Sequence, residues 1–178
     1  LMLGLWVGSD RSLQEKVVLE KQIKTCLEKK VDKQDFKNFI KQKEGMPFLQ
    51  ATKIFKDEKY LTICYGHYGS DVLPKQKKTW RQCNQMLDED VMVRLFAIQK
   101  AIPAFSCFPR HIKIDLFASW YRGGLSGSPK TIALMNQNKF LEASQEFLNN
   151  REYKTTKLLG IKKRMKQTSL KIKQLAEQ

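Results

Sequence analysis

The chain has 178 residues, of which 42% are hydrophobic and 10% aromatic, so it can bury the core of one folded domain and is not intrinsically disordered. Its 33 lysine and arginine residues outnumber its 18 aspartate and glutamate residues, which gives a formal net charge of +15. This charge indicates either a polyanionic partner, such as nucleic acid, an anionic membrane or a bacterial wall, or a solvated lysine-rich surface. Zinc-finger spacing and aromatic-interleaved RNA-binding motifs are absent from the sequence.

The N-terminal part of the chain differs in character from the rest. It opens LMLGLWVGSD, an apolar run too short to span a bilayer, and it does not start with methionine. We interpret residues 1–31 as an N-terminal helical extension, either the remnant of a signal or anchor region or a buried segment. The main domain is predicted for residues 32–178.

A helix that ends in an acidic residue is predicted next. Asp32 is a candidate N-cap, Phe36 and Ile40 follow at helical spacing, and Gly45 is a typical C-terminal residue. Glu44 is therefore predicted at the very end of this helix. The C-terminal end of a helix carries partial negative charge, so an acidic side chain there is electrostatically unfavourable. Residues that depart from such a local preference often mark functional sites. A surface glutamate at a frayed helix end is the alternative.

A β-hairpin is predicted after this helix. The runs ATKIF and YLTICY are rich in β-branched and aromatic residues, and the polar KDEK between them predicts a turn near residues 56–59. Asp57 lies on the turn and Thr62 on the returning strand, so both can face Glu44 across a groove. A tight bend is predicted for residues 66–69, where two glycines bracket a histidine and a tyrosine.

The remainder of the chain predicts helices. Thr79 and Gln82 form a candidate capping pair for the longest of them, in which Cys83, Leu87 and Val91 fall on one face. Prolines at positions 103 and 109 break the chain, and further amphipathic segments follow, the last of them strongly basic. The pattern favours a mainly helical domain with one small sheet, without internal repeats.

The four cysteines are too few and too dispersed for a disulfide scaffold, and none belongs to a CxxC pair. They stand at Cys26, Cys64, Cys83 and Cys107. We expect no metal site at them, and we favour buried thiols over the alternative of one or two disulfide bonds.

These residues together resemble the phage-type lysozymes, also called endolysins or muramidases, over roughly residues 39–170. That family has a helix ending in Glu-Gly, a hairpin bearing an aspartate, then Thr-Ile or Thr-Val, and then Gly-His. Glu44-Gly45, Asp57, Thr62-Ile63 and Gly66-His67 stand here in that order. The form TICYGHYGSDV followed by KTWRQC is most similar to the branch with cysteine before Gly-His.

The resemblance implies an α+β, mainly α lysozyme fold in which a small hairpin lobe and a larger helical lobe are joined by a long helix. It also implies hydrolysis of the β-1,4 bond between N-acetylmuramic acid and N-acetylglucosamine, with no metal or organic cofactor. Glu44 would be the general acid, and Asp57 would stabilise the oxocarbenium-like state and, with Thr62, position the attacking water. Residues 32–178 would form the catalytic domain.

Supporting roles are implied for three further residues, Tyr65, His67 and Arg122, in binding substrate or in supporting the catalytic side chains. A structural role is expected for His67 rather than proton transfer. Arg122 stands where the family commonly has asparagine.

The spacing of the hairpin departs from the family. Twelve residues separate Glu44 from Asp57 and four separate Asp57 from Thr62, so Lys56 occupies the usual aspartate register. Either Asp57 reaches the cleft through a shifted turn, which we favour, or its role has moved to Glu58 or been lost.

Two other functions remain open from the sequence. A lytic transglycosylase would use Glu44 alone, and a catalytically inactive lysozyme-like module would bind wall polymers, nucleic acid or a virion partner. The favoured interpretation implies a monomer with peptidoglycan as its partner, further phage virion or lysis partners, and nonspecific polyanion binding through the basic surface. It places the protein in the host periplasm or at the extracytoplasmic wall, with association with the virion as an alternative.

Overall fold

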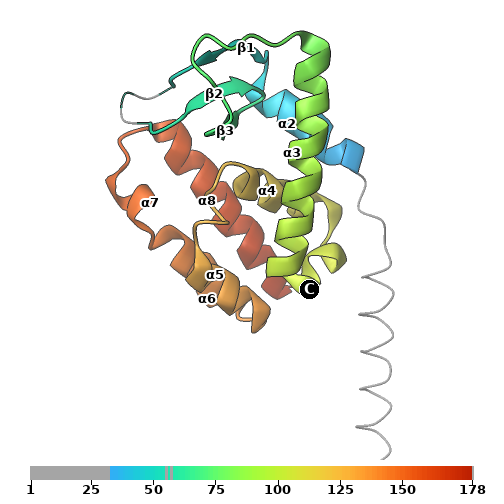
Figure 1. The fold of residues 1–178 in the computed structure, drawn as a ribbon. Helices are drawn as coiled ribbons and strands as arrows, with labels where there is room; N and C mark the ends of the chain where they lie inside the picture. The colour runs from blue at the N-terminus through green and yellow to red at the C-terminus, as the bar shows by residue number, and fades with distance from the viewer. Residues whose placement is uncertain (1–32, 55, 57, 178) are drawn as a thin grey trace, which may run out of the picture.

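The computed structural model describes residues 33–54, 56 and 58–177, which form a small β-sheet lobe and a larger helical lobe (Figure 1). The long helix α3 (Trp80–Ala101) begins beside the sheet and runs down along the helical lobe (Figure 1). This confirms the predicted mainly helical α+β architecture. The expected N-terminal extension, residues 1–31, lies outside the described residues, as does Asp57.

Helix α2 (Lys33–Glu44) carries the candidate acid to the junction of the lobes. Phe36 and Ile40 are buried on one face of the helix, and the ring of Phe36 lies 4.6 Å from that of Phe117 in the helical lobe. At the helix N-terminus, Asp35 accepts two hydrogen bonds of 2.6 Å from Arg110. Burial of this apolar face therefore fixes α2 against the helical lobe.

The sheet is antiparallel with the order β1-β2-β3, formed by β1 (Phe48–Thr52), β2 (Leu61–Cys64) and β3 (His67–Gly69). Two sequence expectations are corrected here. The first strand lies three residues earlier than ATKIF, because its other edge bonds to the chain before α3, with Lys78 N–H donating to the Leu49 carbonyl at 2.9 Å. Residues 67–69 of the expected bend instead form strand β3, because the chain already reverses at Gly66, whose φ is +84°.

The start of α3 confirms the predicted capping pair. The Thr79 hydroxyl accepts a hydrogen bond from the Gln82 N–H at 3.2 Å, and the Gln82 side chain accepts one from the Thr79 N–H at 2.8 Å. The expected apolar face is also confirmed, since Cys83, Leu87 and Val91 are all buried.

The helical lobe contains five α-helices and two 3-10 helices in the described part of the chain. They are η1 (Pro103–Cys107), α4 (Arg110–Tyr121), α5 (Pro129–Asn136), α6 (Phe140–Leu148), α7 (Arg151–Thr155), α8 (Leu159–Gln174) and η2 (Leu175–Glu177). α8 packs against α4 and α6, and Phe147 and Ile172 are fully buried in the core. None of the described helices has both the length and the apolar composition that a membrane span requires.

A disulfide bond joins Cys64 at the end of β2 to Cys83 in the first turns of α3. Both cysteines are buried, but the expectation that they are thiols is wrong. Their Cα atoms lie 5.0 Å apart, which is within the range that a disulfide requires. Sequence spacing could not reveal this contact, because it arises only when the sheet packs on α3.

We predict that this bond contributes about 3 kcal/mol to the free energy of unfolding, because it closes a loop of 19 residues in the unfolded chain. In a variant with Cys26→Ser and Cys107→Ser, in which only this pair is left, a reductant should lower the stability measured by urea unfolding by that amount. A further Cys64→Ser substitution should make stability insensitive to the reductant. Equal stability with and without reductant in the first variant would contradict the prediction.

Candidate active site

Glu44 lies between the two lobes because α2 ends there. Gly45 adopts a left-handed conformation with φ +70°, and its N–H donates to the Lys41 carbonyl at 2.9 Å. On the sheet side, a Cβ atom at Gly66 would lie 4.0 Å from Oε2 of Glu44. On the helical side, Nη1 of Arg122 lies 3.6 Å from Oε1 of Glu44. A turn of the small lobe and the end of α4 thus bracket the carboxyl group.

The two oxygens of Glu44 are in different environments. Oε1 is buried and has no hydrogen-bond donor among the described residues, since the 3.6 Å contact with Arg122 allows an ion pair but is too long for a hydrogen bond. The side chain as a whole is 28% exposed. A carboxyl group that is partly enclosed and reachable, with one oxygen that accepts no hydrogen bond from the described residues, can exchange a proton with a bound molecule. This geometry suits a general acid.

Arg122 is the sequence-predicted residue that the structure brings directly to Glu44. It follows the last residue of α4, and its side chain is 27% exposed. Burial lowers the pKa of Arg122, the nearby charge of Arg164 lowers it further, and Glu44 acts in the opposite direction. The positive charge of Arg122 is therefore opposed by burial and by the charge of Arg164, and it is favoured by Glu44.

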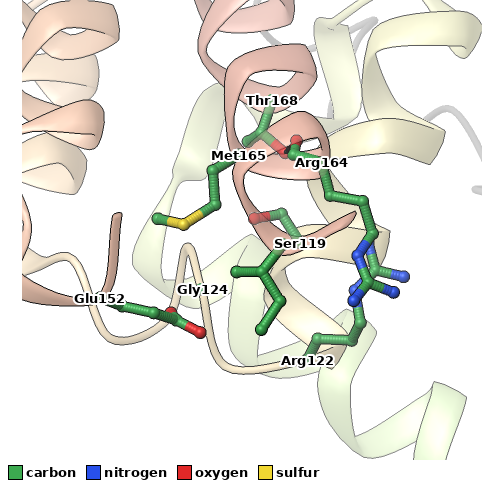
Figure 2. Close-up of a pocket in the computed structure, with 8 residues that line it drawn as sticks. Ser119, Arg122, Gly124, Glu152, Arg164, Met165 and Thr168 are labelled. Carbon is green, nitrogen blue, oxygen red and sulfur yellow. Dashed lines mark hydrogen bonds between the residues drawn. The ribbon is translucent and has the colours of Figure 1, made fainter. Parts of the chain in front are cut away.

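A pocket of about 200 Å³ lies beside Arg122, between α4, α7 and α8 (Figure 2). Its lining includes Ser119, Arg122, Glu152, Ile161, Arg164 and Thr168. In Figure 2 the guanidinium groups of Arg122 and Arg164 point toward each other at one edge, and Glu152 lies at the opposite edge. Within the described ranges, no three His, Cys, Asp or Glu side chains are grouped so that they could hold a metal ion.

His67 is hydrogen-bonded to two carboxylates. Its Nδ1 lies 3.0 Å from both carboxylate oxygens of Asp90 in α3, and its Nε2 lies 2.8 Å from Oδ2 of Asp71. The hydrogen bond to Asp90 raises the pKa of His67, burial opposes this, and Asp71 raises the pKa further. Because both ring nitrogens are engaged, the arrangement fits a structural role for His67 better than a proton relay.

The Asp90 carboxylate contacts polar or charged side chains of three elements, β3, α3 and α4. Burial alone would raise its pKa, but the hydrogen bond from His67 and the charge of Arg94 outweigh this and lower the pKa. Nη1 of Arg94 lies 2.9 Å from Asp90. The Tyr121 hydroxyl lies 3.4 Å from the same carboxylate and donates to the Tyr65 carbonyl at 3.0 Å. Asp90 therefore ties β3 and α4 to α3, and Tyr121 ties α4 to the β2–β3 turn.

Sequence reasoning missed Asp90, although a signal was present. Asp90 follows Leu87 by three residues and Cys83 by seven, so it falls on the apolar face that the helical spacing predicts. An acidic residue on a buried helix face requires a cationic or hydrogen-bonding partner. The identity of that partner, His67, was not predictable from spacing.

The remaining members of the predicted triad are less completely placed. Thr62 is buried in β2, with 3% of its surface exposed, and pairs with Tyr68 of β3. Asp57 lies outside the described residues. Oε2 of Glu58, the alternative carboxylate, accepts a hydrogen bond from the Ile54 N–H at 2.9 Å, which holds Glu58 in the hairpin turn.

Comparison with known proteins adds to this geometry. The family model described as phage lysozyme matches residues 41–168, more than half of the chain. The endolysin of Bacillus phage PZA is 36% identical over 112 residues, which cover 62% of this chain and 42% of that protein. The endolysin of Bacillus phage B103 is 34% identical over 113 residues, with the same coverage of 62% and 42%. The chain thus spans less than half the length of these curated relatives.

We predict that Asp90→Asn lowers the free energy of unfolding by about 3 kcal/mol at about pH 5.5, because it leaves the partly buried cationic groups of His67 and Arg94 without their counter-charge. The raised pKa of His67 means that its contribution is complete below the unfolded value of about 6.5 and is lost as pH rises through the higher folded value. The lowered pKa of Asp90 keeps the carboxylate charged at pH 5.5.

Urea unfolding at about pH 5.5 and about pH 9 measures this effect, and the loss in Asp90→Asn should be smaller at the higher pH. Glu89→Gln, which removes an exposed carboxylate from the adjacent position of α3, is the matched control and should change stability little at either pH. A loss that is equal at both values would show that protonated His67 does not contribute.

Proposed function

Since the chain belongs to the phage lysozyme family, we propose that it hydrolyses the β-1,4 bond between N-acetylmuramic acid and N-acetylglucosamine in bacterial peptidoglycan. The position of Glu44 carries this proposal: the carboxyl group lies between the sheet turn at Gly66 and the end of α4 at Arg122. The relatives bear the name endolysin, which agrees with a wall-degrading enzyme.

In the proposed reaction, Glu44 protonates the oxygen of the leaving sugar. Glycoside hydrolysis requires one such acid, together with a group that stabilises positive charge or directs water on the opposite face of the sugar. The absence of a side chain at Gly66 leaves room beside Oε2 of Glu44 for the glycosidic oxygen. Asp57 would stabilise the oxocarbenium-like state, and Thr62 would help to position the water, as the family resemblance implies.

A lytic transglycosylase is the second candidate, favoured by one observation. Glu58, the alternative second carboxylate, accepts a hydrogen bond from the Ile54 N–H in the hairpin turn, and a transglycosylase needs no second carboxylate. In that reaction a single glutamate acts first as acid and then as base while a hydroxyl group of the substrate attacks. The product contains an internal anhydro ring and is one water lighter than the hydrolysis product.

The basic surface and the disulfide agree with action at a bacterial wall. A net charge of +15 attracts the enzyme to anionic wall polymers and speeds their encounter. The Cys64–Cys83 bond is of the kind that persists in oxidising compartments such as the periplasm. We therefore propose action on the extracytoplasmic side of the host membrane, with peptidoglycan as the partner.

We predict that Glu44→Gln lowers the rate of peptidoglycan cleavage by at least about 100-fold, because glutamine is nearly isosteric but cannot donate the required proton. Purified peptidoglycan is digested with each protein, and the released fragments are identified by mass spectrometry. Reducing-end N-acetylmuramic acid from the unmutated protein supports the hydrolase.

Glu142→Gln, an exposed carboxylate on α6, serves as the control and should retain activity. Anhydro products from the unmutated protein would show that it is a lytic transglycosylase and not a hydrolase. Absence of any product, with all proteins folded, would contradict both and favour an inactive wall-binding module.

We also predict that lysis of intact walls slows as salt rises from about 0.01 M to about 1 M, because the screening length falls from about 30 Å to about 3 Å. The rate is followed by the turbidity of a wall suspension. Cleavage of a short uncharged oligosaccharide should change far less over the same range. Lysis that does not respond to ionic strength would rule out electrostatic attraction to the wall.

A further inference from the structure

The long helix α3 carries apolar side chains on a face that the described residues leave open. Met92, Val93 and Phe96 are 52%, 68% and 71% exposed. They lie on adjacent turns of one face of α3, and α3 runs along an outer side of the described part of the molecule (Figure 1). Single exposed apolar residues are common, but three neighbours on one helix face, one of them aromatic, indicate a surface that binds a partner. We call these three residues the outer row of α3.

The start of helix α2 lies beside the outer row. Nζ of Lys33 and Nζ of Lys37 lie 3.2 Å and 2.6 Å from Oδ1 of Asp88 in α3. Phe96 follows Asp88 by eight residues, which corresponds to about two helical turns and about 12 Å along the helix axis. Residues 1–32, which precede the described part of the chain, are therefore joined to the protein at the edge of the outer row.

The sequence of that preceding part contains an apolar row of matching spacing. Its members recur every four residues and are Leu19, Ile23, Leu27 and Val31. This spacing predicts one face of an amphipathic helix. A helix of residues 19–31 would be about 20 Å long, which is enough to span the outer row. We call these four residues the N-terminal row.

The two rows agree in an antiparallel register. The salt bridges at the start of α2 fix one point of that register, and the chain before α2 is followed from there along α3 in the direction of the C-terminal end of α3. Equal steps along the two helices set Leu27 opposite Met92. One turn further they set Ile23 opposite Phe96. Apolar side chains therefore face each other at both positions.

The charged residues that flank the two rows agree with the same register. Glu89 precedes the outer row on α3, and Lys30 of the N-terminal segment would lie opposite it. Lys100 follows the outer row, and Glu20 would lie opposite it. Both pairs combine opposite charges, which favours this register over one shifted by a turn.

We propose that residues 19–31 form a helix that docks antiparallel on α3 and covers the outer row with the N-terminal row. The occupant is thus a segment of the same chain. Covalent attachment favours it over a separate partner, because a short connection gives the segment an effective concentration at the outer row of about 1 mM or more. Antiparallel helices joined by a short connection are a common packing unit. This inference does not depend on the proposed function.

The first test measures whether the outer row is covered. In the full chain with Cys26→Ser and Cys107→Ser, the substitution Val93→Cys places a thiol in the outer row. Its rate of reaction with a neutral maleimide is followed by mass spectrometry. We expect Ile23→Glu together with Leu27→Glu to raise that rate at least about tenfold, because a covered thiol reacts only when the covering segment opens.

Two matched controls separate docking from other effects. Gln14→Glu with Thr25→Glu adds the same two charges away from the N-terminal row and should leave the rate at position 93 unchanged. A thiol introduced by Leu159→Cys, at an exposed position of α8, should react at one rate with and without the changes at positions 23 and 27. If those two changes do not alter the rate at position 93, the proposal is overturned.

A second test checks the register and the identity of the occupant. In the same background, Ile23→Cys with Phe96→Cys should form a disulfide bond within one chain under mild oxidation, because facing positions of packed helices come within reach of the bond. Thr25→Cys with Phe96→Cys should form far less of it, since position 25 lies away from the N-terminal row. A bond between two chains would identify a second copy as the occupant and overturn the proposal. Absence of the bond, or equal yields for positions 23 and 25, would overturn it as well.

Discussion

The hydrogen-bonded ion pair between His67 and Asp90 joins the sheet to the long helix, and the geometry around the proposed acid depends on it. His67 directly follows Gly66, where an added Cβ atom would lie 4.0 Å from Oε2 of Glu44. Any displacement of His67 would therefore move the turn that borders the carboxyl group. The same carboxylate of Asp90 also approaches the Tyr121 hydroxyl in α4, the residue that precedes Arg122, so one buried charge positions both sides of the site.

A second connection holds the same turn from its other end. Cys64, two residues before Gly66, is bonded to Cys83, and His67, one residue after it, is bonded to Asp90. Cys83 and Asp90 are seven residues apart in α3, which places them two turns apart on one face of the helix. The β2–β3 turn is thus attached to α3 by a covalent bond and by an ion pair. This double attachment keeps a three-stranded sheet, which has little core of its own, in a fixed place.

The electrostatics around Glu44 connect the fold with the proposed chemistry. The carboxyl group proposed as the acid, that of Glu44, lies 3.6 Å from the guanidinium of Arg122. Arg164 adds a second positive charge nearby. Glu44 acts on Arg122 in the opposite direction from burial and from Arg164.

The sequence by itself determined the features that depend on neighbours along the chain. The capping pair of Thr79 and Gln82 lies within one helical turn, and the helix end at Glu44 and Gly45 follows from a periodic apolar pattern that stops at glycine. The order of these residues also carried the family resemblance and, through it, the two-lobed fold. Local backbone geometry is set by interactions over three or four residues, so spacing is sufficient to predict it.

Only the tertiary structure decided which distant groups meet. Glu44 meets Arg122, His67 meets Asp90, and Cys64 meets Cys83 instead of remaining a thiol. The position of β1 likewise depended on hydrogen bonds to residues 76–78, which no propensity of its own sequence contains. These partners are brought together by the packing of helices and sheet on a shared core, and the energy of burying that core is not specific to any one pair. Spacing along the chain therefore does not encode them.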